Sequence, residues 1–464
     1  MTDYENLLIR KLSTVPPTGI QHPAQFTCPM FPHQDALTRW ALQRGRAAIF
    51  ADTGLGKTRM ELAWADAVVT QTNKPVLILA PLAVAAQTAR EADSVGMHVN
   101  VCREQSDISG GINITNYDRI HKFNPDEFSG VVLDESSIIK HHDAKTFRQL
   151  TEMFDATQFK LAATATPAPN DWTELGTHAE WLGICTRAEM LSEYFTHDGG
   201  ETAVWRLKGH AREVFWRWVS SWGAMIGKPS DLGFDDSAYI LPSLTLNEHT
   251  LDVEMPTNGM LFAMEAQTLS ERRDARRASM SARVEECARI VNADAHEPWV
   301  VWCDLNDESK SLTKAIHGAV EITGSDDVDV KESRLSAFAN GDYRVLVSKP
   351  SICGWGLNWQ HAARMAFVGV TDSYEAYYQA VRRCWRFGQT RPVDVHIFAS
   401  KSEGAVVANL RRKEMAAQSM SAALSGETRA AVMQEVLGVT RQTNLYNAIT
   451  RIHIPSFLRD TCTA

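Results

Sequence analysis

The stretch from Ala51 to Thr58, ADTGLGKT, holds the residue types in this chain that are best suited to chemistry. Glycines at positions 54 and 56 allow backbone N–H groups to turn inward around phosphate oxygens. Lys57 can reach the β- and γ-phosphates of a nucleotide, and the Thr58 hydroxyl can coordinate magnesium. The strict motif has glycine where this chain has Ala51, and an ordinary glycine turn is the alternative. The stretch predicts a site for ATP and Mg²⁺ built from Thr53, Gly54, Leu55, Gly56, Lys57 and Thr58.

A pair of acids about eighty residues further along completes this chemistry. Asp134 and Glu135 directly follow an apolar run at 130–133. An acid at the end of a strand is where a second protein ligand of Mg²⁺ is expected, alongside Thr58. The adjacent Glu135 is placed to orient or deprotonate an attacking water. Such a pair is a weak signal alone and a strong one together with the phosphate loop.

Local sequence patterns indicate the elements that would position these residues. Apolar runs at 47–50, 75–80, 111–115, 130–133 and 159–163 predict buried strands. The segment 59–69 can present one apolar face as a helix, and its N-terminus would favour phosphate. Strands that alternate with helices indicate an α/β fold with a parallel sheet, whose ligands bind at the carboxyl ends of the strands.

Other residues near these elements are candidates for binding. Gln34 opens a predicted helix at 35–43, and its amide could bind the adenine edge, although alone it would be a solvated helix-start residue. The ends of two predicted strands could hold a phosphodiester backbone through Pro81, Leu82, Thr115 and Asn116, with ordinary loops as the alternative. Tryptophans between 172 and 240 are interpreted as core residues rather than as a stacking surface for single strands. Arg272, Arg273, Arg276 and Arg277 form either a phosphate-facing stripe or a solvated helix face.

A second α/β series begins at 299–302 and continues with predicted strands at 320–323, 343–347, 365–370 and 393–398. It has no phosphate loop of its own, which suggests that it closes over a nucleotide held by the first domain. Arg383 and Arg386 are three residues apart and share one helical face. An arginine from a second domain can neutralise charge on a transferred phosphoryl group.

The motifs FPHQ, ADTGLGKT, LAPLAV, TNYDRI, VLDESS and ATATPAPNDWTEL occur in the order and spacing of superfamily-two helicases. Together with GWGLN and QAVRRCWRFGQ, they resemble the Swi/Snf-type translocase branch, and the compact chain is similar to short bacteriophage helicases of this branch. Ser136-Ser137 departs from the common Asp-Glu-x-His ending. The resemblance implies two tandem RecA-like domains, adenine binding by Gln34, an arginine finger at Arg386 with Arg383 beside it, and further contacts from Gly356 and Asn358. It also implies nucleic-acid contacts from Ser351 and Gly354.

On this basis we expect a lead-in at 1–25, an ATP-binding RecA-like domain at 26–180 and a helical Trp-rich extension at 181–245. A second RecA-like domain at 246–400 and a helical brace at 401–464 would follow. The predicted function is that of an ATP-dependent DNA translocase or helicase that favours duplex DNA. The alternatives are an RNA helicase of related fold and a non-hydrolysing nucleic-acid-binding protein.

The composition of the whole chain agrees with this prediction. The 464 residues carry a net charge of −9, which leaves room for a locally basic groove on an acidic body. No run approaches the roughly 18 apolar residues of a membrane span. Eight scattered cysteines include no C-x-x-C pair, so we expect neither a disulfide framework nor a zinc site. We therefore expect a monomeric cytoplasmic protein.

Overall fold

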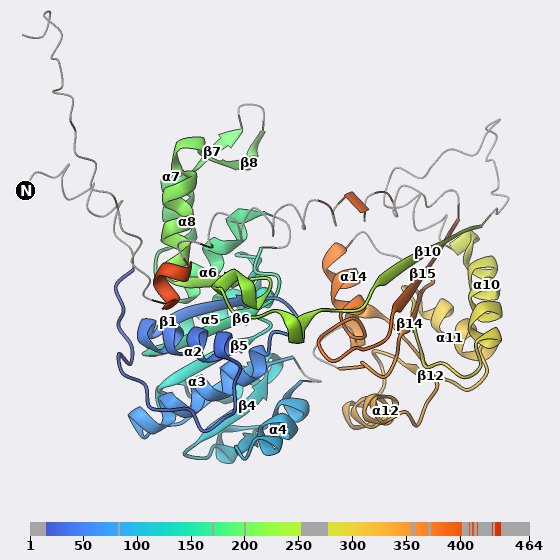
Figure 1. Ribbon diagram of the computed structural model, residues 1–464, viewed down its shortest axis with the longest axis horizontal. Coiled ribbons are helices and arrows are strands. Elements are labelled where there is room, and N and C mark those ends of the chain that lie inside the picture. Colours follow the sequence, from blue (N-terminus) through green and yellow to red (C-terminus); the bar gives the residue numbers. More distant parts are fainter. Residues whose placement is uncertain are drawn as a thin grey trace, which may run out of the picture.

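Two parallel β-sheets, each covered by helices, form two RecA-like domains that lie side by side (Figure 1). The structure is a computed structural model, and it describes residues 15–81, 84–168, 171–198, 201–251, 277–353, 358–369 and 373–400, with 408, 411–412, 415, 429 and 432–437. Within these residues no helix is long and apolar enough to cross a membrane.

The first sheet has seven parallel strands in the order β3-β4-β2-β5-β6-β1-β9. These strands are β1 (Arg46–Ala51), β2 (Val76–Ala80), β3 (Val99–Val101), β4 (Ile112–Asn116), β5 (Gly130–Asp134), β6 (Phe159–Thr164) and β9 (Gly223–Ile226). Helices α2 (Pro32–Arg44), α3 (Lys57–Thr72), α4 (Ala85–Ser94), α5 (Lys145–Met153) and α6 (Leu175–Trp181) pack around it. The central strands are buried along their length, as expected for a parallel sheet covered on both faces. The five strands predicted for this half are confirmed.

The second sheet has six parallel strands in the order β10-β15-β14-β11-β13-β12. They are β10 (Leu244–Leu251), β11 (Trp299–Trp302), β12 (Ala319–Ile322), β13 (Val345–Ser348), β14 (Arg364–Phe367) and β15 (Val393–Ser400). The helices of this domain are α10 (Met280–Ala293), α11 (Asn306–Ala315), α12 (Val328–Asn340), α13 (Pro350–Cys353) and α14 (Tyr374–Val381). The predicted strands of the second half are therefore present, with boundaries shifted by a few residues.

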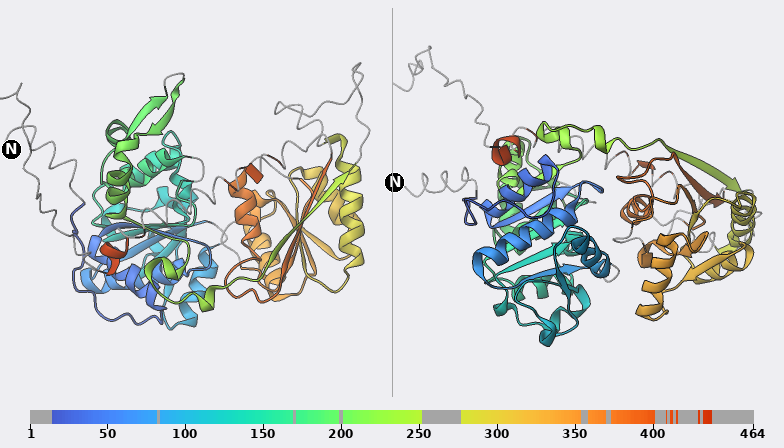
Figure 2. Two further views of the ribbon diagram at one scale, coloured as in Figure 1. Left: turned by 45° about the horizontal axis from the view of Figure 1, so that its top comes forward. Right: turned by 60° about the horizontal axis from the view of Figure 1, so that its bottom comes forward.

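The segment predicted as a helical extension, 181–245, is only partly helical. Helices α7 (Arg187–Tyr194) and α8 (Arg212–Ser220) project from the first domain with the antiparallel hairpin of β7 (Phe195–Asp198) and β8 (Glu201–Leu207) (Figures 1 and 2). The chain then returns as β9, which pairs with β1 and completes the first sheet. The correction has a physical reason, because a short strand at the sheet edge shows little periodicity of its own.

The tryptophans of this segment belong to the core, as interpreted from the sequence. Trp181, Trp216 and Trp222 are buried on one face of the first sheet. Trp172, Trp205 and Trp218 pack against the same cluster while partly exposed. The rings of Trp172 and Trp216 lie 4.7 Å apart, edge to face.

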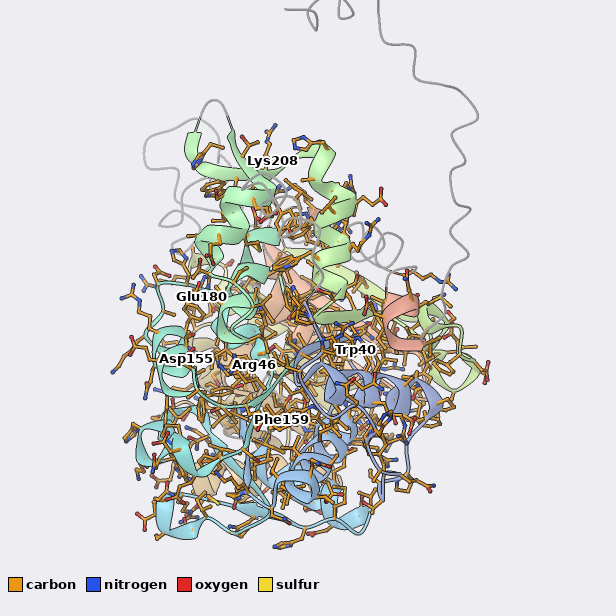
Figure 3. All side chains as sticks on the ribbon, turned by 90° about the vertical axis from the view of Figure 1, so that its left-hand side faces the viewer. Trp40, Arg46, Asp155, Phe159, Glu180 and Lys208 are labelled. Carbon is orange, nitrogen blue, oxygen red and sulfur yellow. The ribbon has the colours of Figure 1, made fainter. Side chains whose placement is uncertain are left out.

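Two basic side chains at the amino edge of the first sheet tie its strands to the neighbouring loop and helix. Arg46, at the start of β1, donates hydrogen bonds to the carbonyl groups of Asp155 and Thr157, at 3.1 and 2.8 Å (Figure 3). Lys160 is buried beside it and donates to the Trp181 carbonyl at 2.9 Å. The Thr157 and Trp181 bonds satisfy carbonyl groups of buried residues, whereas Asp155 is exposed.

Two segments connect the domains or return across them. Strand β10 carries the chain from the first domain into the second sheet (Figure 2). Near the C-terminus, residues 432–437 form a helix that packs on the first domain, where Val432 enters its core and Glu435 pairs with Arg44. Most of the predicted brace at 401–464 lies outside the described residues, as does most of the lead-in.

Candidate nucleotide-binding and catalytic site

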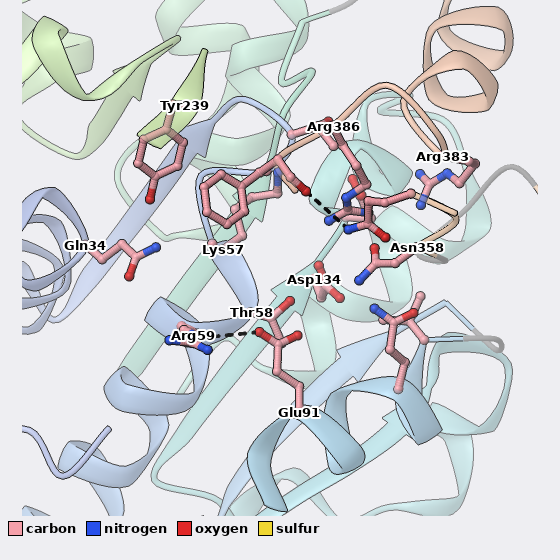
Figure 4. Close-up of a pocket in the computed structure, with 18 of the residues that line it drawn as sticks. Gln34, Lys57, Thr58, Arg59, Glu91, Asp134, Tyr239, Asn358, Arg383 and Arg386 are labelled. Atoms are coloured by element: carbon pink, nitrogen blue, oxygen red, sulfur yellow. Dashed lines mark hydrogen bonds and ion pairs between the residues drawn. The ribbon is translucent and has the colours of Figure 1, made fainter. Parts of the chain in front are cut away.

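A cavity of about 380 Å³ lies where the two domains meet, and both contribute to its walls (Figure 4). The structure brings most of the predicted site residues to this cavity: Gln34, Thr53, Gly54, Gly56, Lys57, Thr58, Asp134, Glu135, Asn358, Arg383 and Arg386. Leu55 is instead buried in the core behind the loop. Gly356 lies outside the described residues.

The predicted phosphate loop connects β1 to α3. Gly54 and Gly56 have φ angles of +92° and +83°, in a region that favours glycine. A Cβ atom at position 56 would lie 2.1 Å from the Gln34 amide nitrogen, so a larger residue could not fit without moving that side chain. Lys57 is the first residue of α3, and its Nζ donates to the Ala51 carbonyl at 2.9 Å. The backbone conformation of the loop therefore favours glycine at both positions. The Lys57 ammonium group lies against the loop backbone, where the phosphates of a nucleotide would bind.

Gln34 holds the loop in a way that the sequence did not indicate. Its Nε2 donates to the Leu55 carbonyl at 2.9 Å, and its Oε1 accepts from the Phe31 N–H at 2.9 Å. The residue is 2% exposed. Gln34 thus joins the first turn of α2 to the phosphate loop, and adenine contact by its amide stays a prediction.

The acidic pair lies at the carboxyl end of β5. Burial, together with the neighbouring Glu135 carboxylate, raises the pKa of Asp134 to about 7. The Thr164 hydroxyl, from the end of β6, donates to Glu135 Oε2 at 3.4 Å. Two carboxyl groups and the Thr58 hydroxyl line one cavity, and this oxygen-rich, negatively charged set fits Mg²⁺. The structure thus links the acids to the hydroxyl-rich segment that follows β6.

Two buried residues beside the acids were missed from the sequence. Glu61, one turn beyond Lys57 on α3, is 1% exposed, and burial followed by the charge of Asp134 raises its pKa well above the usual range. His178, on α6, has its Nε2 3.1 Å from the Ser136 hydroxyl, and burial lowers its pKa to about 4. His178 therefore contacts the segment in which the common histidine is replaced by serine. Only the fold reveals this pairing, because 42 residues separate the partners.

The second domain contributes arginines from the turn that follows α14. Helix α14 ends at Val381, so Arg383 and Arg386 do not share one helical face, which corrects that prediction. Arg383 and Arg386 face Asp134 and Lys57 across the cavity (Figure 4). Burial lowers the pKa of each guanidinium to about 10, so both are cations at neutral pH. Arg383 donates to the Gln379 backbone and side-chain oxygens at 3.0 and 2.9 Å. The site can therefore place positive charge opposite the phosphate loop.

The predicted nucleic-acid contacts are not all presented to solvent. Thr115 is 1% exposed and donates to the Cys102 carbonyl at 2.8 Å, while Asn116 accepts from the Arg119 N–H. These two side chains form contacts within the first domain, and nucleic-acid contact by Thr115 and Asn116 stays a prediction. Pro81 is half-buried and Ser351 is exposed. Leu82, Gly354, Arg272, Arg273 and Arg276 lie outside the described residues, whereas Arg277 is exposed.

Comparisons with known proteins give family matches in both domains. Residues 28–169 match the family model described as type III restriction enzyme, res subunit, and residues 282–388 match the helicase conserved C-terminal domain. No curated protein matches the chain significantly. Among solved structures, the chain is similar to the Sulfolobus solfataricus SWI2/SNF2 ATPase core in complex with dsDNA. That likeness has a TM-score of 0.42 and 16% identity, and it covers 90% of this chain and 99% of the other. The two family matches together support a superfamily-two helicase and a nucleic-acid-dependent motor.

Proposed function

We propose that this chain is an ATP-dependent DNA translocase or helicase of the Swi/Snf-like branch that hydrolyses ATP between its two domains. The observation that carries the proposal is the shared cavity, in which Lys57 and Glu135 of the first domain face Arg383 and Arg386 of the second. A binding protein that used only the phosphate loop would not need buried arginines from another domain at the same place. The preference for DNA rests on the sequence motifs, and the Swi/Snf branch and the bacteriophage likeness stay predictions.

The residues of the cavity divide the work of phosphoryl transfer. Lys57 and the loop N–H groups bind the β- and γ-phosphates. Thr58 and Asp134 would hold Mg²⁺, which supplies charge neutralisation to the phosphate oxygens. Glu135 orients the attacking water and accepts its proton. Arg386, with Arg383 beside it, stabilises the negative charge that develops on the transferred phosphoryl group.

Movement along nucleic acid would follow from closing and reopening this cavity. Both domains must approach for the arginines to reach the phosphates, so each hydrolysis cycle is coupled to a change in their separation. A strand held by both domains would then advance with the cycle. Contacts to the nucleic-acid backbone would give little sequence preference.

Steady-state ATP hydrolysis tests this proposal, with no nucleic acid, duplex DNA, single-stranded DNA and RNA in parallel. We expect stimulation by duplex DNA and a loss of about 100-fold or more in Glu135→Gln, which keeps the shape of the side chain but cannot accept the proton. Stimulation by RNA alone would favour the RNA helicase. No turnover under any condition would contradict the motor and leave a nucleic-acid-binding protein.

A further inference from the structure

Asp52 lies in the phosphate loop, yet none of the roles above uses it. Its backbone N–H donates to the Ile226 carbonyl of β9 at 3.0 Å, and its Oδ1 accepts from the Thr53 N–H at 2.6 Å. The carboxylate is therefore fixed relative to the first sheet. Its side chain is 28% exposed, and the groups that approach it come from the second domain.

Two side chains of the second domain bind this carboxylate. Arg382 Nη2 donates to Asp52 Oδ2 at 2.8 Å, and the Tyr378 hydroxyl donates to Oδ1. The Arg382 guanidinium lies over the rings of Tyr378 and Trp385, with distances of 5.2 and 4.7 Å to their centroids. Because the Arg382 side chain is only 10% exposed, this ion pair is better shielded from solvent than an ordinary surface pair.

The same segment of the second domain also contacts the phosphate loop and the chain that connects β9 to β10. Trp385 Nε1 donates to the Pro242 carbonyl at 2.7 Å. The Phe387 ring lies 4.9 Å from that of Tyr239, and a Cβ atom at Gly54 would come within 2.9 Å of the Phe387 Cβ. Arg382, Trp385 and Phe387, the residues that make these contacts, alternate in sequence with Arg383 and Arg386, which line the cavity. Any shift of these three residues would therefore move both arginines.

We infer that Asp52, Arg382 and Tyr378 form an interdomain latch that sets the position of Arg383 and Arg386 over the phosphate loop. Arg382 and Tyr378 are positioning residues, since they act through the arginines beside them. The latch also links closure to charge, because Arg382 neutralises the Asp52 carboxylate next to the phosphate site only when the domains are together. The expected effect of the latch on kcat rests on the proposed ATP hydrolysis. Its expected effect on the separation of the two domains does not.

A double-mutant cycle tests the latch on the full chain. Asp52→Asn keeps the oxygen that accepts from Thr53, and Arg382→Gln removes the partner charge. We expect each single change to lower kcat about tenfold with little change in KM, within the usual range for coupling between sites. The double variant should lose about the same tenfold, because the second change removes nothing further. Single variants with wild-type kcat, or a double variant about 100-fold slower, would overturn the latch.

Tyr378→Phe tests the second contact of the latch. It removes one hydroxyl and should give a smaller loss in kcat than Asp52→Asn; a wild-type kcat would count against the role of Tyr378.

A control variant and a scattering measurement keep the test independent of folding and of the proposed function. Asp394→Asn is the matched control, because its ion pair with Arg364 has the same 28% exposure but lies within the second domain. Small-angle X-ray scattering should show a larger radius of gyration for Asp52→Asn and Arg382→Gln than for wild type. The control should have the same radius of gyration as wild type. If wild type hydrolyses no ATP, the proposed function fails while scattering still decides the latch: unchanged radii would overturn it.

Discussion

Glu135 adopts a left-handed backbone conformation with a φ angle of +53°. For a residue other than glycine this costs about 1–3 kcal/mol, and such strain persists where surrounding contacts over-determine it. Those contacts are present on both sides, since the Tyr117 hydroxyl donates to the Asp134 carbonyl at 2.6 Å and Ser136 meets His178. The strain therefore aims the Glu135 carboxylate into the cavity, where the proposed water activation needs it.

The burial of His178 makes stability sensitive to acid. Burial holds the pKa of His178 near 4, below the value of about 6.5 for an unfolded histidine. Between these values the unfolded chain binds a proton at His178 that the folded protein does not bind, so the contribution of this residue to stability falls as pH decreases from 6.5 to 4. On going from pH 7.5 to pH 4.5, the change in the free energy of unfolding measured with urea should be less favourable by about 2–3 kcal/mol in wild type than in His178→Gln. Asp134 and Glu61, whose raised pKa values act in the opposite direction, are present in both proteins and cancel in this difference.

The control for this experiment is His197→Gln, since His197 is exposed on the projecting hairpin. That variant should keep the pH dependence of stability of wild type. An equal pH dependence in wild type and His178→Gln would show that His178 is protonated in the folded protein and would contradict the assignment.

Single residues of the site differ in how far the sequence predicts them. Lys57, Thr58, Asp134 and Glu135 lie in contiguous motifs, where spacing fixes their mutual position once the strands are known. Glu61, His178 and Asp52 acquire their surroundings from distant parts of the chain, and no local pattern distinguishes them. Thr115 illustrates the limit of a polar residue at a strand end as a signal, because its hydroxyl donates to the Cys102 carbonyl, a contact that its position in the sequence does not specify.

At the scale of elements, buried strands with continuous apolar runs were predictable, whereas three of the four edge strands of the two sheets were not; the edge strand β12 was predicted. Strands β3 and β9 lie at the two edges of the first sheet, and β10 lies at an edge of the second. Strand β10 alternates half-buried and exposed residues along most of its length, and its sequence LTLNEHTL contains several polar residues. An edge strand pairs on one side only, so tertiary contacts decide its existence more than its own sequence.

A buried ion pair joins two helices of the second domain. Arg283 on α10 lies 2.7 Å from Glu308 on α11, and both side chains are fully buried. Glu308 also accepts from the N–H groups of Asp304 and Leu305 at 3.0 Å. Arg283→Met should therefore destabilise this domain by about 3–5 kcal/mol, because it leaves a buried carboxylate without its cation.

Urea unfolding followed by tryptophan fluorescence measures this effect, since Trp299 and Trp302 are buried in the same domain. The double variant Arg283→Met/Glu308→Gln should recover part of the loss. Arg289→Met, on the same helix but 66% exposed in its own ion pair, should stay within about 1 kcal/mol of wild type. A double variant less stable than Arg283→Met alone would contradict a role for the ion pair.

At the scale of the whole molecule, the chain is two RecA-like domains, and most of the residues predicted to bind ATP and Mg²⁺ line one cavity between them. The sequence predicted both domains and the chemical groups that each contributes. It did not predict which contacts hold them together, because these involve side chains of ordinary type, such as Tyr378 on Asp52 and Trp385 on Pro242. The return of residues 432–437 to the first domain was equally hidden, since an Ala-rich helical pattern does not specify a docking site.

The measurement that tests the composite site most directly is single-turnover hydrolysis of ATP by Arg386→Ala, compared with wild type and Arg217→Ala. Arg217 is an exposed arginine on α8, far in sequence from the cavity motifs. We expect Arg386→Ala to bind ATP within a few-fold of wild type and to hydrolyse it about 10³-fold more slowly or worse, as for loss of an arginine finger. Arg217→Ala should behave as wild type. Hydrolysis at the wild-type rate by Arg386→Ala would contradict a site shared between the two domains.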